Sequence, residues 1–121
     1  MQVEVRLVLK TDAGEPFMGI GLVWLLDGIA RTGSISEAAR GMELSYPKAL
    51  RMLRDLEHGL GAPVVVRRKG GAERGRTDLT PLGADFVRRY DRVQALVARH
   101  AVRVAHDELS PLLTPPPAPA R

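Results

Sequence analysis

The sequence predicts a mainly α-helical fold with a small β-hairpin and an N-terminal strand. Three observations support this fold class. Stretches with helical periodicity follow one another between residues 18 and 60, with only short breaks between them. A basic, glycine-rich stretch between two short β-branched runs comes next and is typical of a hairpin. A long apolar stripe at helical spacing then runs from Pro81 to about Glu108 and indicates one extended helix.

The N-terminal residues alternate in polarity. Apolar side chains occupy the odd-numbered positions from Val3 to Leu9, and polar side chains occupy the even-numbered ones except Val8. A period of two predicts a half-buried strand over residues 2–10. The run Asp12–Pro16 contains turn-forming residues and ends this strand.

Two short-linked helices are predicted next. Residues 18–32 have a buried stripe at helical spacing, and Gly33 is placed to end that helix. Ser34, with Glu37 three residues later, fits a capping box that begins a second helix of about two turns. The dipeptide Glu43-Leu44 then makes a very short connection.

A third helix begins after Ser45, which is a good N-cap residue, and tolerates Pro47 in its first turn. Gly61 and Pro63 end it. The run Val64–Val66 predicts a strand, residues 67–76 a loop with three glycines, and residues 77–79 the returning strand. The order of helix, tight turn, helix and hairpin is that of a winged helix-turn-helix.

The last predicted helix begins with Thr80 as N-cap and Pro81 at its first position. Its near-heptad apolar stripe predicts packing against a second subunit, and therefore a homodimer. The candidate interface residues are Phe86, Tyr90, Val93, Val97, Ala101 and Val104. We expect residues 1–108 to form the domain with its dimerisation helix, and residues 109–121 to be a disordered Pro/Ala-rich tail.

Composition excludes several classes of protein. The chain of 121 residues has no cysteine, which excludes a disulfide scaffold, and no histidine pair at helical ligand spacing, so no metal site is expected. No grouping of nucleophile, base and acid has a motif around it, so we expect neither catalytic residues nor a cofactor, and not an enzyme. With no signal sequence and no apolar run of about 20 residues, a cytoplasmic protein without membrane contact is expected.

Positive charge is concentrated in one stretch. Residues 40–76 hold nine of the 18 cations and only four of the 14 acids. Clustered cations are the electrostatic footprint of a phosphate backbone. On the third helix, Tyr46, Lys48, Arg51 and Arg54 would face outward, opposite the apolar side, and the hairpin adds further cations. A charged helix face is more often simply solvated, so only the whole arrangement favours double-stranded DNA as the partner.

Five segments resemble the N-terminal domain of the ModE molybdate-responsive repressors and are similar to the DNA-binding domain of LysR-type regulators. They are residues 32–39, residues 44–49, Leu56-Glu57, residues 66–68 and residues 79–83. The preceding strand, the Ser45-Tyr46 start of the third helix and the Gly-Gly hairpin favour the ModE-like side.

The resemblance implies a homodimeric transcription regulator that binds a palindromic operator, with Ser45, Tyr46, Lys48 and Arg51 at the DNA. Our full set of candidate DNA-binding residues is Ser34, Ser45, Tyr46, Pro47, Lys48, Arg51, Arg54, Arg67, Arg68, Lys69, Arg74 and Arg76. Pro47 and Lys48 depart from the family pattern, so base preference is not transferred. Because the sequence stops after the resemblance to the first domain, we expect no molybdate-binding domain and no small-molecule effector in this chain. The alternative is a winged-helix module for protein–protein interaction or dimerisation without DNA readout.

Overall fold

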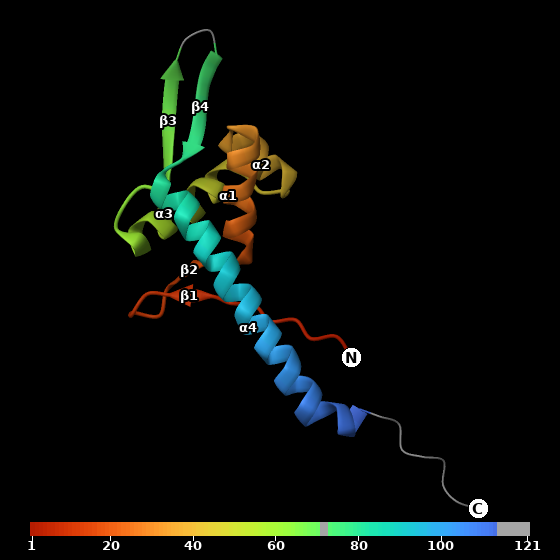
Figure 1. Ribbon diagram of the computed structural model, residues 1–121. Coiled ribbons are helices and arrows are strands. Elements are labelled where there is room, and N and C mark those ends of the chain that lie inside the picture. The colour runs from red at the N-terminus through yellow and green to blue at the C-terminus, as the bar shows by residue number, and fades with distance from the viewer. Residues whose placement is uncertain (71–72, 114–121) are drawn as a thin grey trace, which may run out of the picture.

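The structure, a computed structural model, describes residues 1–70 and 73–113 and is mostly helical (Figure 1). Three helices follow a short N-terminal hairpin, a longer hairpin projects from them, and a long helix closes the chain. The elements are β1 (Leu9–Lys10), β2 (Pro16–Met18), α1 (Ile20–Thr32), α2 (Ile35–Gly41), α3 (Tyr46–Leu60), β3 (Val65–Gly70), β4 (Glu73–Leu79) and α4 (Pro81–Leu113). The predicted fold class is therefore confirmed.

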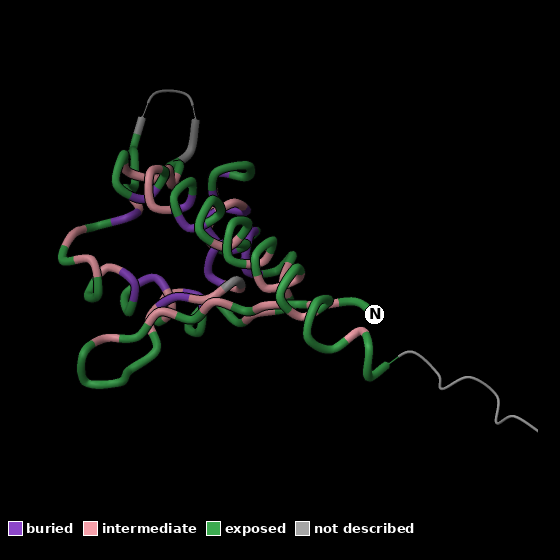
Figure 2. The backbone as a smooth tube through the Cα atoms, turned by 60° about the horizontal axis from the view of Figure 1, so that its bottom comes forward, coloured by how far each residue is buried: buried purple, intermediate pink, exposed green. Residues whose placement is uncertain are grey.

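The core lies where α1 meets α2, α3 and the base of the longer hairpin (Figure 2). Its largest fully buried side chains are those of Leu25, Leu26, Ile29, Leu56, Val23 and Val64. Aliphatic side chains supply most of the core, as the low aromatic content requires. Burying each large one contributes about 1.5–3 kcal/mol to folding.

The N-terminal strand was predicted too long. Only Leu9–Lys10 forms a ladder, and its partner is β2, which periodicity did not indicate. The alternation itself is correct, because the odd-numbered side chains from Val3 to Leu9 are half-buried and the even-numbered ones are exposed. Alternating polarity reports which face is buried, but it does not report whether a neighbouring strand is present.

Two side chains of α4 hold this extended segment in place of a strand. The Gln94 amide accepts from Leu7 N (3.2 Å) and donates to the Val5 carbonyl (2.6 Å), and the Tyr90 hydroxyl donates to the Leu7 carbonyl. The segment and α4 are therefore joined, although they lie at opposite ends of the chain.

The region between α1 and α4 also contains two carboxylates. Burial raises the pKa of Asp27, the nearby Asp91 raises it further, and Arg31 opposes the change. Burial, with Asp91 as a second cause, also raises the pKa of the Tyr90 hydroxyl. Because folded Asp27 binds its proton more tightly than an unfolded aspartate, its contribution to stability declines as the pH rises through the folded pKa.

The prediction of a loop over residues 67–76 was wrong, because both strands of the longer hairpin extend into this range. β3 and β4 pair from Val65–Leu79 through Arg68–Arg76, and the ladder reaches Gly70–Glu73 after a register shift. A projecting ribbon is polar on both faces, so no alternation of apolar and polar residues marks its strands. Arg67 and Arg76 therefore lie on strands, whereas the Gly71 expected in this loop lies outside the described residues.

The last helix continues to Leu113, beyond the expected end at Glu108. Pro111 lies inside it. A proline removes one backbone donor and crowds the preceding turn, yet only two residues follow before the described helix ends. Residues 114–121 of the expected tail lie outside the described residues.

The start of α4 packs tightly against the residue that precedes β3. Thr80 caps the helix by accepting from Gly83 N (3.0 Å) and donating to the Pro63 carbonyl (2.8 Å). A Cβ atom at Gly83 would lie 2.3 Å from the Val64 carbonyl oxygen. Only glycine permits this approach, which places the hairpin base against α4.

We predict that Gly83→Ala lowers the free energy of unfolding by about 2 kcal/mol, because the backbone at Val64 must move to admit the methyl group. Gly41→Ala is the matched control, since a Cβ there meets open space. Chemical denaturation of both variants tests the prediction. Equal stabilities would show that the contact between α4 and Val64 is not constrained in this way.

Candidate nucleic-acid interface

The turn between α2 and α3 is short and rigid. Met42 ends α2 by donating its N–H to Ala39 O, and Leu44 N also donates to Ala39 O (2.9 Å). Between them Glu43 adopts a left-handed backbone with φ of 57°. Such a turn fixes the angle between the two helices without a glycine.

Packing of α3 determines which of its residues face solvent. Ala49, Leu53 and Leu56 are buried, and the Ser45 side chain caps the helix by accepting from Lys48 N (3.2 Å). The predicted contact residues on this helix are all exposed: Ser45, Tyr46, Pro47, Lys48, Arg51 and Arg54. The half-buried Met52 packs against the core.

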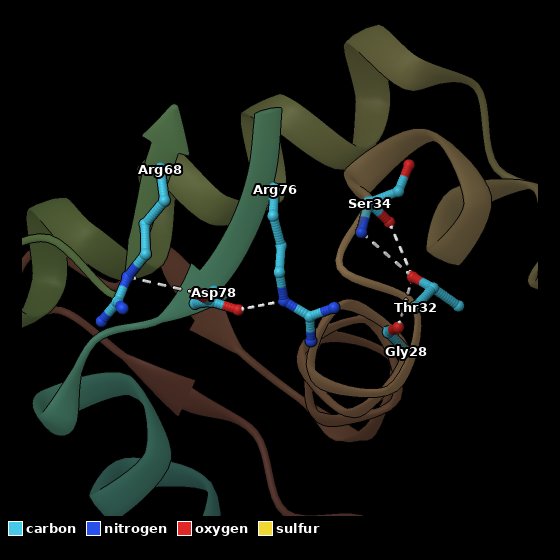
Figure 3. Close-up of polar contacts among 6 residues, drawn as sticks. All are labelled: Gly28, Thr32, Ser34, Arg68, Arg76 and Asp78. Atoms are coloured by element: carbon cyan, nitrogen blue, oxygen red, sulfur yellow. Dashed lines mark hydrogen bonds and ion pairs between the residues drawn. The ribbon is translucent and has the colours of Figure 1, made fainter. Parts of the chain in front are cut away.

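The start of α2 is held by a local network (Figure 3). Thr32 Oγ1 contacts the Gly28 carbonyl (2.7 Å) and accepts from Ser34 N (3.2 Å), while Ser34 Oγ accepts from Glu37 N (3.1 Å). Ser34 is the N-cap as predicted. The Ser34 N–H donates to the Thr32 hydroxyl. In a capping box it would donate to the Glu37 side chain instead.

The hairpin, or wing (residues 65–79), joins this same point. Gly33 ends α1 in the left-handed conformation, and its carbonyl accepts from Thr77 N of β4 (2.9 Å). A groove of about 210 Å³ lies between the wing and the helices, and Ser34, Ser36, Tyr46 and Arg67 are among its lining residues. The structure thus brings three of the predicted contact residues together.

The wing cations do not form one cluster. Ladder partners Arg68 and Arg76 share one face of the ribbon with Asp78, whose carboxylate accepts from Arg76 Nε (2.6 Å) and lies 3.2 Å from Arg68 Nε. Arg67, one residue earlier, projects to the opposite face, toward the groove. Lys69 is exposed, and the side chain of Arg74 falls outside the described part of the chain.

The predicted interface stripe on α4 divides into two groups. Tyr90 is buried in the subunit's own core, with the half-buried Phe86 ring 6.4 Å away, centroid to centroid. Ala101 is half-buried, whereas Val93, Val97 and Val104 are exposed. Trp24 of α1 is also 57% exposed.

The sequence matches the family described as "Bacterial regulatory helix-turn-helix protein, lysR family" over residues 22–84, from α1 through the wing to the start of α4. The chain belongs to this LysR-type family. Regulators that bind DNA, rather than enzymes, make up this family, and the predicted resemblance is confirmed.

Three curated relatives match part of the chain, and two of them are named for molybdenum. The chain is 43% identical over 82 residues to "Molybdenum-pterin-binding protein MopB" of Rhodobacter capsulatus, covering 68% of this chain and 30% of that protein. It is 36% identical to "Molybdenum transport protein ModE" of Azotobacter vinelandii (70% and 31% covered) and 32% identical to "Transcriptional regulator ModE" of Haemophilus influenzae (90% and 42% covered). The chain therefore spans less than half the length of these relatives.

Solved structures of LysR-type proteins share the fold. The CbnR DNA-binding domain in complex with DNA has a TM-score of 0.57 and 24% identity, with 74% of this chain and 98% of that chain covered. The BenM DNA-binding domain with a catB site has a TM-score of 0.53 and 18% identity, with 74% and 93% covered. At these identities the likeness supports the architecture only.

Within residues 1–70 and 73–113, no helix has both the length and the apolar composition that crossing a bilayer requires. Across the same residues, no three histidine or acidic side chains gather as they would around a metal ion.

We predict that Ser34→Ala destabilises the domain by about 1 kcal/mol, because it removes the hydroxyl that satisfies the Glu37 N–H. Ser36→Ala, in the same helix turn but exposed, is the control and should not lower stability. Thermal unfolding of the two variants measures the difference. If both unfold at the same temperature, the cap does not contribute as the geometry indicates.

Proposed function

We propose that this chain is a sequence-specific DNA-binding transcription regulator. The observation that carries the proposal is the exposed face of α3, which presents Tyr46, Lys48 and Arg51. Of these, Tyr46 also lines the groove together with Arg67. The major groove of B-DNA admits one α-helix, and a helix that projects from a rigid turn fits it. One relative is named a transcriptional regulator and one structural neighbour is a complex with DNA, and both support this role.

Base edges and phosphates would be contacted by different elements. Arg51 lies one turn into α3, where a guanidinium can donate two hydrogen bonds to a guanine. Arg67 and the hydroxyls at Ser34 and Tyr46 surround the groove, which suits a phosphate of the adjacent backbone. We therefore propose that the cations of α3 and of the wing contact DNA, and that Arg67 makes the central phosphate contact.

The proposal does not extend to molybdenum compounds, for which two of the relatives are named, and assigns this chain no effector, cofactor or catalytic role. Residues 1–108 would form one DNA-binding unit with its dimerisation helix, and α4 continues that helix to Leu113. A cytoplasmic location is part of the proposal, because the DNA that such a regulator binds is located there.

We further propose that α4 joins two copies of the chain. Beyond Tyr90 the helix extends away from the core (Figure 1), and Val93, Leu96, Val97 and Val104 expose apolar surface along it. A stripe at near-heptad spacing on an isolated helix is stabilised by packing against another helix. A second copy would bury this surface and give two α3 helices related by a twofold axis, which matches a palindromic site.

Arg51→Ala should reduce the preference for a selected duplex over a random one, because the loss falls on a base contact worth about 1–3 kcal/mol. Arg67→Ala should weaken binding to both duplexes alike and reduce the salt slope by about 0.9, because it removes a phosphate contact. Competition binding at several salt concentrations, with a duplex selected from a random pool, measures both effects.

Arg99→Ala, an exposed substitution far along α4, is the control and should leave both quantities unchanged. Equal losses on both duplexes for Arg51→Ala and Arg67→Ala would contradict the proposed division between base and phosphate contacts. An unaltered protein that dimerises but binds no duplex would instead support a protein–protein interaction module.

Val97→Asp should convert the dimer to a monomer, because two carboxylates would have to be buried between the paired helices. Ala95→Asp is the matched control, since Ala95 is also exposed but lies on the other side of α4. Sedimentation equilibrium measures the dissociation constants. A Val97→Asp protein that remains as dimeric as the control would overturn the proposed interface.

A further inference from the structure

The wing contains a carboxylate between two of the cations expected to bind DNA (Figure 3). Asp78 Oδ1 accepts from Arg76 Nε at 2.6 Å, and Asp78 Oδ2 lies 3.2 Å from Arg68 Nε. One carboxylate therefore forms ion pairs with two arginines, one on each strand of the wing. On sequence alone, all the wing cations are predicted to bind DNA, and Asp78 has no predicted role.

The β-ladder fixes this arrangement. Arg68 pairs with Arg76 and Val66 pairs with Asp78, so the three charged side chains project from the same face. The Asp78 side chain is 25% exposed, against 72% for Arg68 and 47% for Arg76. The carboxylate is thus the more enclosed member, and the arginines reach back to it from solvent.

Arg76 is also fixed at a second place. A Cβ atom at Gly33 would lie 2.8 Å from Arg76 Nη1, so this side chain lies directly over the end of α1. The carboxylate therefore restrains a guanidinium that is packed against the helix-turn-helix unit. By contrast, no described acidic side chain lies within ion-pair distance of Arg67 on the other face.

A DNA phosphate would compete with Asp78 for both guanidinium groups. While the carboxylate is in place, this face of the wing carries one net positive charge from two arginines, and its attraction for any phosphate backbone is reduced. Attraction of this kind does not depend on base sequence and supplies nearly all of non-specific binding, so its reduction lowers the affinity for random DNA.

We propose that Asp78 is an internal counter-ion that limits the sequence-independent attraction of the wing for DNA phosphates. This inference rests on the proposed DNA-binding function. It makes Asp78 a positioning residue, which acts through Arg68 and Arg76 rather than by touching the DNA. Its removal should increase the affinity for random duplex.

Asp78→Asn tests this, because asparagine keeps the shape and removes the charge. Asp85→Asn is the matched control: Asp85 also accepts from two arginines, Arg88 and Arg89, but lies on α4 outside the wing. Both substitutions raise the net charge by one. The probe is a random-sequence duplex, with binding measured from about 50 to 200 mM salt, and thermal unfolding reports whether each variant is folded.

We expect Asp78→Asn to bind random duplex more tightly than Asp85→Asn at low salt, and to steepen the log–log salt slope by about 0.9. That slope corresponds to a further loss of roughly threefold in affinity between the two salt concentrations. In the Arg68→Ala/Arg76→Ala background, Asp78→Asn should no longer exceed the control. Asp78→Glu should restore the wild-type slope.

Equal salt slopes for Asp78→Asn and Asp85→Asn, or weaker binding by folded Asp78→Asn, would overturn the inference. So would an undiminished effect in the background without the two arginines. If the unaltered protein binds neither random nor selected duplex, the proposed function itself fails. The two failures are therefore distinguishable in one set of measurements.

Discussion

The backbone at Gly33 connects the three parts of the domain. Its N–H donates to Ile29 O and ends α1, its left-handed conformation turns the chain into α2, and its carbonyl accepts from Thr77 of the wing. A single residue thus determines where the first helix stops, how the second begins and how the wing is docked. Left-handed φ values favour glycine, and a Cβ at this position would require the Arg76 side chain to move.

The placement of α3 follows from the packing of α2 and α3 against α1. Gly28 allows α2 to approach α1, since a Cβ there would lie 2.9 Å from the Ala38 Cβ. With α2 close to α1, the rigid turn at Glu43 directs Ala49 and Leu53 into the core. The opposite face of α3 is then held in place by the packing of the buried face, which is what a surface that reads base edges requires.

Local signals in the sequence predicted much of this architecture. Caps at Ser34, Ser45 and Thr80 act within a few residues, so the side chain and the helix it begins are both visible in the sequence. The apolar spacing of α3 identified its buried side and therefore its exposed residues. These are features in which cause and effect lie within one turn of helix.

Features that depend on distant residues were not predictable. Periodicity gave the burial pattern of residues 3–9 but could not show that Gln94, on the far end of the chain, takes the place of a neighbouring strand. The count of charges in the sequence treated the wing arginines as one basic group. The strand register places Arg67 and Arg68 on opposite faces, and it places Asp78 beside Arg68. The predicted interface stripe on α4 likewise included both Tyr90, which is buried in the core of its own subunit, and valines that are exposed.

The length of α4 beyond the core has a consequence for the geometry of an operator. A helix rises about 1.5 Å per residue, so the portion after Tyr90 extends roughly 35 Å, about one turn of B-DNA. In a pair of chains joined along this portion, the extent of helix overlap determines how far apart the two α3 helices lie. Half-site spacing would then be encoded in the register of α4, independently of the residues that contact bases.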